Sequence, residues 1–319
     1  MQDWAVRAHS GVAAAFRHEA LLYSGETQFL AATLAFIRHG LADRETVLVA
    51  VGAEKIELLQ RHLGDDAADV SFVDMAEAGR NPATIIPLWS EFVEHNRATG
   101  RRFRGIGEPT WPGRSPAALV ECKNHEALVN LAFAEGPSWS LLCPYDEAGL
   151  ESDVIADARA THPYLLDHGG RNPGSDFDPQ LTGRPGRDDA LPPAPTATEQ
   201  IRFGPGSLGE IRATVSAYAS NVGLARGRVA DFVLAINELV GNSLCHGGGA
   251  GVLRLWVEPD TLLGEVGDRG TITDPLAGRR RPGPDQSGGR GLWITNHVCD
   301  LVQIRSGPGS TVVRVHMAR

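Results

Sequence analysis

The sequence predicts two domains of different fold class, an α/β domain with a three-layer sheet followed by an α+β sandwich. The chain has 319 residues, more than one ordinary hydrophobic core accommodates. Residues 167–199 are dense in Pro, Gly and Asp and offer little to bury, so we expect a linker there. Strand-like and helix-like runs follow a different order on its two sides, which makes 1–166 and 200–319 the predicted domains.

Strands and helices alternate in the N-terminal domain. Val47–Val51 is an unbroken apolar run with β-branched residues, typical of a central parallel strand covered on both faces. Pro116 suits the first turn of a later helix. The expected strands are 47–51, 70–73, 103–107 and 140–143, and the expected helices are 27–41, 54–63, 85–99 and 115–134. This alternation predicts a sheet between two layers of helices.

The C-terminal domain begins with two helices and continues mainly with strands. Helical patterns cover 207–221 and 226–246, and strand patterns cover 251–257, 262–266, 301–305 and 311–316. Glu258–Asp260 suits a hairpin turn between the first two of these strands. Helices grouped against a mostly antiparallel sheet predict an α+β sandwich.

Composition argues against several classes of partner. The formal net charge is −9 and no long basic run occurs, so neither direct nucleic-acid binding nor docking on anionic lipid is expected. No apolar stretch reaches the ~20 residues that span a bilayer, and the first residues lack the apolar core of a signal peptide. The four cysteines form no CxxC pair, which is typical of reduced thiols. We therefore expect a cytoplasmic protein without membrane contact.

Polar residues recur on one face of the predicted helix 226–246. Glu238, Asn242 and His246 are spaced by four residues, so their side chains share that face. A carboxylate and an amide one turn apart can serve a hydrated Mg²⁺, and nucleotide phosphates would supply its other ligands. Taken alone, the pattern fits a polar strip facing solvent at least as well.

Two glycine-containing segments downstream extend this pattern toward nucleotide binding. Asp268 ends a strand, where its carboxylate can accept a hydrogen bond from an adenine amino group, and Gly270 lets the backbone pass close to the base. A simple turn after a strand has the same composition. A glycine-rich loop then opens a helix at Gly289–Leu292, where backbone amides and Arg290 suit phosphate, unless it is only a loop before a helix. Thr311 places a hydroxyl at the start of the last strand.

The order and spacing of these elements resemble the N, G1, G2 and G3 boxes of the GHKL ATPase superfamily. Residues 238–247 match the helix E-L-x-x-N-x-x-x-H-G of its anti-sigma-factor serine-kinase branch, and the resemblance covers about 198–319. It implies a Bergerat-type sandwich that binds ATP with Mg²⁺ under a mobile lid, 271–288, which carries three consecutive arginines. By position, the resemblance implies that Asn242 binds Mg²⁺ and that Glu238 is the general base or polarises the attacking group. It implies that Asp268 and Gly270 recognise adenine, with Thr311 in support. The residues implied to bind the phosphates are Gly289, Arg290, Gly291 and Leu292.

Polar residues at the ends of predicted elements suggest a pocket in the N-terminal domain. They are His18, Tyr23, Glu108, Glu121 and His125. In open α/β sheets, ligands gather at the carboxyl ends of strands, so one interpretation is a pocket for a small-molecule signal. The other interpretation is that these groups hold loops together.

Residues 18–164 resemble the MEDS sensory domain, a P-loop-like α/β fold associated with small-molecule sensing. The resemblance depends on H-x-x-x-x-Y at 18–23, Gly-Glu at 107–108, E-x-x-x-x-E at 121–126 and C-P-Y-D at 143–146. No GxxxxGK[ST] motif occurs, so a Walker loop is not expected. A MEDS-like domain followed by an anti-sigma-type ATPase domain resembles the RsbA-type anti-sigma regulatory proteins.

This resemblance implies a regulator of sigma-factor-dependent transcription, with a role in stress responses. The ATPase domain would bind a sigma factor or an anti-sigma antagonist and, as a protein kinase, phosphorylate Ser or Thr of that antagonist. A small-molecule or protein signal at the N-terminal domain would control it. Two alternatives stay open: a sensor histidine kinase-like protein without its own acceptor helix, and a non-catalytic, nucleotide-gated binding module. Related ATPase domains often dimerise, so a homodimer is a further open alternative.

Overall fold

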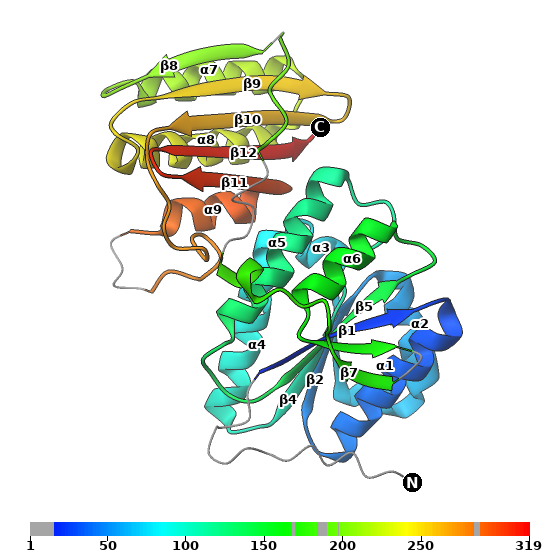
Figure 1. Ribbon diagram of the computed structural model, residues 1–319. Helices are drawn as coiled ribbons and strands as arrows, with labels where there is room; N and C mark the ends of the chain where they lie inside the picture. The colour runs from blue at the N-terminus through cyan, green and yellow to red at the C-terminus, as the bar shows by residue number, and fades with distance from the viewer. Residues whose placement is uncertain (1–15, 168–169, 184–189, 197, 284–287) are drawn as a thin grey trace.

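Two sheets, one in each half of the chain, organise the molecule (Figure 1). The computed structural model describes residues 16–167, 170–183, 190–196, 198–283 and 288–319. The N-terminal half is of mixed α/β class, and the C-terminal half is an antiparallel sheet with helices, which confirms the two predicted classes at this level. None of the helices in the described ranges has the length and apolar character that crossing a membrane requires.

The first sheet has the strand order β3-β2-β4-β5-β1-β6-β7, and its neighbours are parallel except for β6 and β7. Its strands are β1 (Arg17–Tyr23), β2 (Thr46–Val51), β3 (Val70–Asp74), β4 (Phe103–Gly107), β5 (Ser140–Asp146), β6 (Tyr164–Asp167) and β7 (Gly170–Pro173). The helices of this half are α1 (Glu26–Ala42), α2 (Ala53–Leu63), α3 (Met75–Ala78), α4 (Ile85–Thr99), α5 (Pro116–Ala132) and α6 (Ser152–Thr161). Short 3-10 turns are η1 (Gly64–Asp69), η2 (Pro82–Thr84) and η3 (Pro179–Gly183).

Each face of this sheet has its own hydrophobic core. Successive residues of a strand point to opposite faces. In β2, Val47 and Val49 pack in the cluster that contains residues of α1 and α2. Leu48 and Ala50 of the same strand pack in the cluster that contains residues of α4 and α5. The sheet therefore lies between two helical layers.

The central position of β1 differs from the prediction. β1 pairs with β5 on one side and β6 on the other, although no strand is predicted there. Its His18 and Glu19 are buried and polar, so they interrupt the apolar pattern by which the other strands are recognised. Part of the predicted linker is also structured, because β7 extends the sheet and η3 packs against α5.

The second sheet is antiparallel throughout, in the order β11-β12-β10-β9-β8. Its strands are β8 (Glu199–Phe203), β9 (Gly251–Glu258), β10 (Thr261–Asp268), β11 (Leu301–Gly307) and β12 (Ser310–Ala318). The helices α7 (Leu208–Asn221) and α8 (Arg226–His246) cover one face, where Phe232 and Ile236 of α8 join Leu255 and Val266 in one core. The helix α9 (Arg290–Val298) lies between this sheet and the N-terminal domain (Figure 1).

Candidate functional site

A cavity of about 560 Å³ opens in the C-terminal domain beside α8, the end of β10 and the start of α9. Segments that are distant in the chain meet in its wall, and most of the residues singled out from the sequence in this domain line it. These are Asn242, Asp268, Gly270, Gly289, Gly291, Leu292 and Thr311. The volume lies within the range typical of small-molecule and cofactor sites.

Both oxygens of the Asp268 carboxylate are held in place. Oδ1 accepts a hydrogen bond from the Gly270 amide at 2.7 Å, and Oδ2 accepts one from the Ser243 hydroxyl. A Cβ on Gly247 would lie 2.4 Å from the Asp268 Cγ, so the backbone approaches the carboxylate as only glycine allows. Because a carboxylate offers about four lone-pair sites, Asp268 can still accept a hydrogen bond from an amino group in the cavity.

Thr311 supports this corner of the cavity through the backbone. It lies opposite Asp268 in the register of β10 and β12. Its hydroxyl donates a hydrogen bond to the Gly270 carbonyl at 3.1 Å and lies 2.8 Å from the Ser306 hydroxyl. Thr311 therefore acts on the position of Gly270, whose amide in turn holds the Asp268 carboxylate.

Glu238 and Asn242 reach the start of α9. A Cβ on Gly291 would lie 2.9 Å from the Asn242 Nδ2 and 3.1 Å from the Glu238 Oε2, so a larger residue would displace one of the two side chains. Gly289 caps α9 in the left-handed conformation, with φ 83°. The unpaired amides of a helix N-terminus attract anions, and exposed Arg290 adds a positive charge at the same end.

Three consecutive lid arginines point to two different places. Arg280 and Arg281 line the cavity. Arg279 is buried, at 8% exposure, and its guanidinium lies 3.7 Å from the Glu121 carboxylate of α5 in the other domain. It also donates a hydrogen bond to the Pro82 carbonyl at 3.4 Å. The described part of the predicted lid is therefore clamped by the N-terminal domain, while 284–287 lie outside the described residues.

Further contacts join the lid and its surroundings to the N-terminal domain. Leu276 packs in the hydrophobic cluster of α4 and α5. Arg305 of β11 donates to the Glu121 carboxylate at 2.9 Å, and both side chains are largely buried. The Asn81 side chain donates to the Asn296 carbonyl of α9 at 2.8 Å. Helix α9 and the lid, which both border the cavity, thus contact the other domain directly.

The predicted sensory residues lie in three separate environments rather than around one pocket. Tyr23 and Glu108 are at the carboxyl edge of the sheet, where Lys55 donates hydrogen bonds to both of them. Burial raises the pKa of Glu108. Burial by itself would lower the pKa of Lys55, but Glu108 raises it overall. This group is therefore a partly buried ion pair near the strand ends, with Glu108 buried and Lys55 half-buried. Glu121 is in the domain interface described above.

His18 and His125 belong to the interior of the N-terminal domain. His18 lies near the start of β1 and contacts the Glu126 carboxylate at 3.0 Å. His125 is buried, and burial lowers its pKa to about 3. Burial alone would raise the pKa of Glu126, but His162 and His18 lower it to about 2. His18 is the second residue of β1 and Tyr23 its last, so these two predicted residues lie at opposite ends of the strand.

Four residues make important contacts here that the sequence reasoning did not assign. Ser243 is a polar residue on the buried side of α8, which is a signal that periodicity can detect. Glu126 belongs to the E-x-x-x-x-E motif, but the motif does not reveal its neighbours. Lys55 and His162 are brought to their partners only by the tertiary fold.

Comparisons with known proteins match one family in each half of the chain. Residues 17–163 match the family described as MEDS, the methanogen/methylotroph, DcmR sensory domain. Residues 201–317 match the histidine kinase-like ATPase domain family. The search of curated proteins found no match. The crystal structure of the RsbU and RsbW domains of Rv1364c from Mycobacterium tuberculosis is similar at 22% identity and a TM-score of 0.30, over 40% of this chain and 34% of that one. That similarity spans about a third of the other chain's length.

Proposed function

We propose that this chain, which joins a MEDS domain to a histidine kinase-like ATPase domain, is a regulator of sigma-factor-dependent transcription. In this proposal the C-terminal domain binds ATP with Mg²⁺ and holds a sigma factor or an anti-sigma antagonist. The N-terminal domain receives a small-molecule or protein signal and adjusts that activity. The resemblance of residues 238–247 to the anti-sigma serine-kinase pattern supports this choice of partner.

The cavity supports ATP as the ligand of the C-terminal domain. Asp268 would accept a hydrogen bond from the adenine amino group, in a corner that Ser243 and Gly270 keep rigid. The phosphates would lie at the start of α9, near the cavity arginines Arg280 and Arg281. The Asn242 amide oxygen would be a ligand of Mg²⁺, with phosphate and water oxygens as the others.

The regulatory part of the proposal depends on one observation, the clamp of Arg279 by Glu121 next to two arginines that line the cavity. A bound triphosphate acts on Arg280 and Arg281, and a movement of α5 acts on Arg279. Because Arg279, Arg280 and Arg281 are adjacent in the chain, a shift of Arg280 and Arg281 in the cavity would strain the contact between Arg279 and Glu121. A shift of Arg279 would in turn strain the contacts of its two neighbours. This gives the two domains a shared element, which coupling between sites requires.

The kinase activity within the proposal assigns one proton transfer to Glu238. The Ser or Thr hydroxyl of a bound protein would attack the γ-phosphorus, Glu238 would accept its proton, and the bond to ADP would break. Glu238→Ala should then retain ATP binding and lose transfer of radiolabelled phosphate to the partner. Acid-stable label on Ser or Thr supports this reaction, whereas acid-labile phosphohistidine supports the histidine-kinase alternative.

Partner capture from the native cell tests the proposed function directly. The full chain should retain a sigma factor or a small antagonist, and the amount retained should change when Mg-ATP is added. Asp268→Asn should lose that nucleotide effect, and Asp260→Asn, in the exposed β9–β10 turn, is the matched control. Capture of neither class of protein contradicts the proposal. Normal, nucleotide-insensitive capture by Asn242→Ala would favour a non-catalytic binding module.

A further inference from the structure

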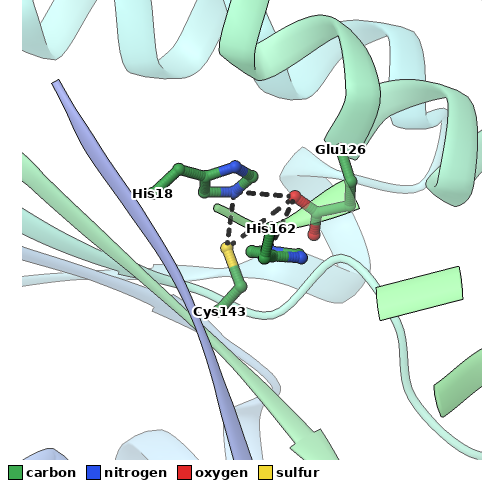
Figure 2. Close-up of side chains that lie close together, drawn as sticks. All are labelled: His18, Glu126, Cys143 and His162. Atoms are coloured by element: carbon green, nitrogen blue, oxygen red, sulfur yellow. Dashed lines mark hydrogen bonds and ion pairs between the residues drawn. The ribbon is translucent and has the colours of Figure 1, made fainter. Parts of the chain in front are cut away.

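Four metal-binding side chains meet in the N-terminal domain, outside the nucleotide site (Figure 2). His18 comes from β1, Glu126 from α5, Cys143 from β5, and His162 from the segment between α6 and β6. All four are at most 2% exposed. Their ligand atoms lie within 4.8 Å of one another. Two imidazoles, a thiol and a carboxylate are an expensive group to bury, so the cluster requires an explanation.

Four of the six distances between these atoms lie close to the edges of a metal tetrahedron, and all six are within 4.8 Å. Bonds of about 2.0–2.3 Å from zinc to N, O and S donors give tetrahedral edges of roughly 3.3–3.8 Å. The Glu126 Oε2 lies 3.0 Å from the His18 Nε2 and 3.5 Å from the His162 Nε2. The Cys143 Sγ lies 3.4 Å from the His18 Nε2 and 3.8 Å from the Glu126 Oε2. A divalent ion fits between these four atoms with small side-chain adjustments.

Hydrogen bonds behind the two histidines orient their Nε2 atoms toward the centre. The His162 Nδ1 lies 2.7 Å from the Ala158 carbonyl, which only accepts, so Nδ1 carries the proton. The Asn130 Nδ2 donates to two backbone carbonyls, which leaves its Oδ1 to accept from the His18 Nδ1 at 3.1 Å. Metal-binding histidines are held by their other ring nitrogen in this way.

The carboxylate is oriented by the same kind of support. The Tyr145 hydroxyl donates a hydrogen bond to the Glu126 Oε1 at 2.8 Å. The other oxygen, Oε2, is thereby directed to the centre of the cluster, where it meets the sulfur and both histidines (Figure 2). His18, Glu126 and His162 thus each present one atom to the centre of the cluster, and the second polar atom of each side chain is held by a hydrogen bond outside it.

The cluster without a cation leaves a polar atom unsatisfied. The His162 Nε2 is buried and has no hydrogen-bond partner within the described part of the chain. Its lone pair faces the negatively charged Glu126. A divalent cation would give this nitrogen a partner, and with one thiolate and one carboxylate the centre would have no net charge. Neutral, fully coordinated centres are the ones that a protein interior tolerates.

We propose that His18, Glu126, Cys143 and His162 bind one divalent metal ion of the zinc class. Four protein ligands close a tetrahedral shell, so the ion would have a structural or sensory role and would not activate water. Nitrogen and sulfur donors select zinc-like ions over Mg²⁺ and Ca²⁺. A cavity of about 320 Å³ borders the cluster on one side, since Glu126 is part of its wall. The thiol proton of Cys143 leaves as the metal–sulfur bond forms.

Titration of the metal-free, untagged full chain with Co²⁺ tests this site. One equivalent should bind with a thiolate-to-cobalt charge-transfer band and the visible bands of a tetrahedral ion, and Zn²⁺ should then remove both. Cys143→Ser should lose the charge-transfer band. Cys122→Ser is the matched control, because Cys122 is equally buried but donates to the Pro109 carbonyl, and it should retain the band. Asn130→Ala should weaken binding about 10–100-fold.

Two results would overturn the site: absence of a stoichiometric cobalt spectrum in the folded chain, or a charge-transfer band that persists in Cys143→Ser. A measurement on the unmodified chain covers the case in which that variant does not fold. X-ray absorption of the zinc-loaded protein should show one sulfur and three nitrogen or oxygen ligands. Any other ligand set also contradicts the proposal. These readouts need no nucleotide, so they do not depend on the function proposed for the ATPase domain.

Discussion

Glu121→Gln should release the lid from the N-terminal domain while both domains stay folded. Glutamine keeps the shape of the side chain and removes its charge. In the native chain this carboxylate lies 3.7 Å from Arg279 and 2.9 Å from Arg305. Glu121 is only 2% exposed and Arg279 only 8%, so water screens this interaction poorly.

The size of the effect follows from burial. Removing one member of a buried ion pair costs about 3–5 kcal/mol, because its partner's charge stays in a poorly solvated place. Arg279 can avoid that cost by swinging out with the lid, since Arg280 and Arg281 face the open cavity and Gly278 precedes them with φ 74°. The free energy of lid opening should therefore fall by about 3 kcal/mol, a factor of roughly 100 in the opening equilibrium.

Amide hydrogen exchange of the full chain measures this directly. Exchange across 271–283 should accelerate by up to roughly 100-fold in Glu121→Gln, while the amides of β10 and β12 keep their protection. Lys123→Gln is the matched control on the same helix as Glu121, because it breaks a partly exposed ion pair with Asp157 of α6, worth about 0–1 kcal/mol. Equal lid exchange in the two variants, or faster exchange everywhere in Glu121→Gln, would refute the clamp.

Three further outcomes test the site and the core. Asp268→Asn should weaken ATP binding about 10–100-fold by calorimetry, because the charged acceptor is lost; an unchanged affinity would remove Asp268 from the base site. Gly291→Ala should reduce ATP binding, because its Cβ would lie 2.9 Å from the Asn242 Nδ2; Gly288→Ala meets no atom within 4 Å and should bind normally. Burial lowers the pKa of His316 to about 4 in the folded protein, whereas the pKa in the unfolded chain is near 6.5. Between pH 4 and pH 6.5, the unfolded state therefore binds the proton on this side chain and the folded state does not. Urea unfolding should show stability that falls as the pH falls through this window, and His316→Gln should make that fall smaller by up to about 3 kcal/mol, while other buried histidines such as His125 keep their share of it.

The regular elements could be predicted where one physical signal dominates. Helix 226–246 has an uninterrupted apolar stripe, and the structure places α8 over the same residues. Val47–Val51 is apolar at every position, and β2 covers it as an interior strand between β3 and β4. The nucleotide-site residues could also be proposed, because each lies at the end of such an element next to glycine, and the cavity brings most of them together.

Other features depend on partners that are distant in the sequence. Nothing local distinguishes Arg279 from the two arginines that follow it, and only the position of Glu121 in the folded chain turns its side chain the other way. The polar residues of β1 look unlike a central strand, because their partners, Glu126 for His18 and Arg171 for Glu19, come from other elements. His18 thus interrupts the apolar pattern of the strand and is also one of the four residues of the buried cluster.

Helix α5 connects that cluster to the lid. Glu121 and Glu126 are five residues apart, which separates them by about 7.5 Å along the helix axis and by roughly 140° around it. One therefore faces the ATPase domain while the other faces the sheet. If binding of the proposed ion shifted α5, Glu121 would move with Glu126 relative to Arg279, because both carboxylates belong to that helix. Because coupling is reciprocal, the factor by which the ion changes ATP affinity must equal the factor by which ATP changes affinity for the ion.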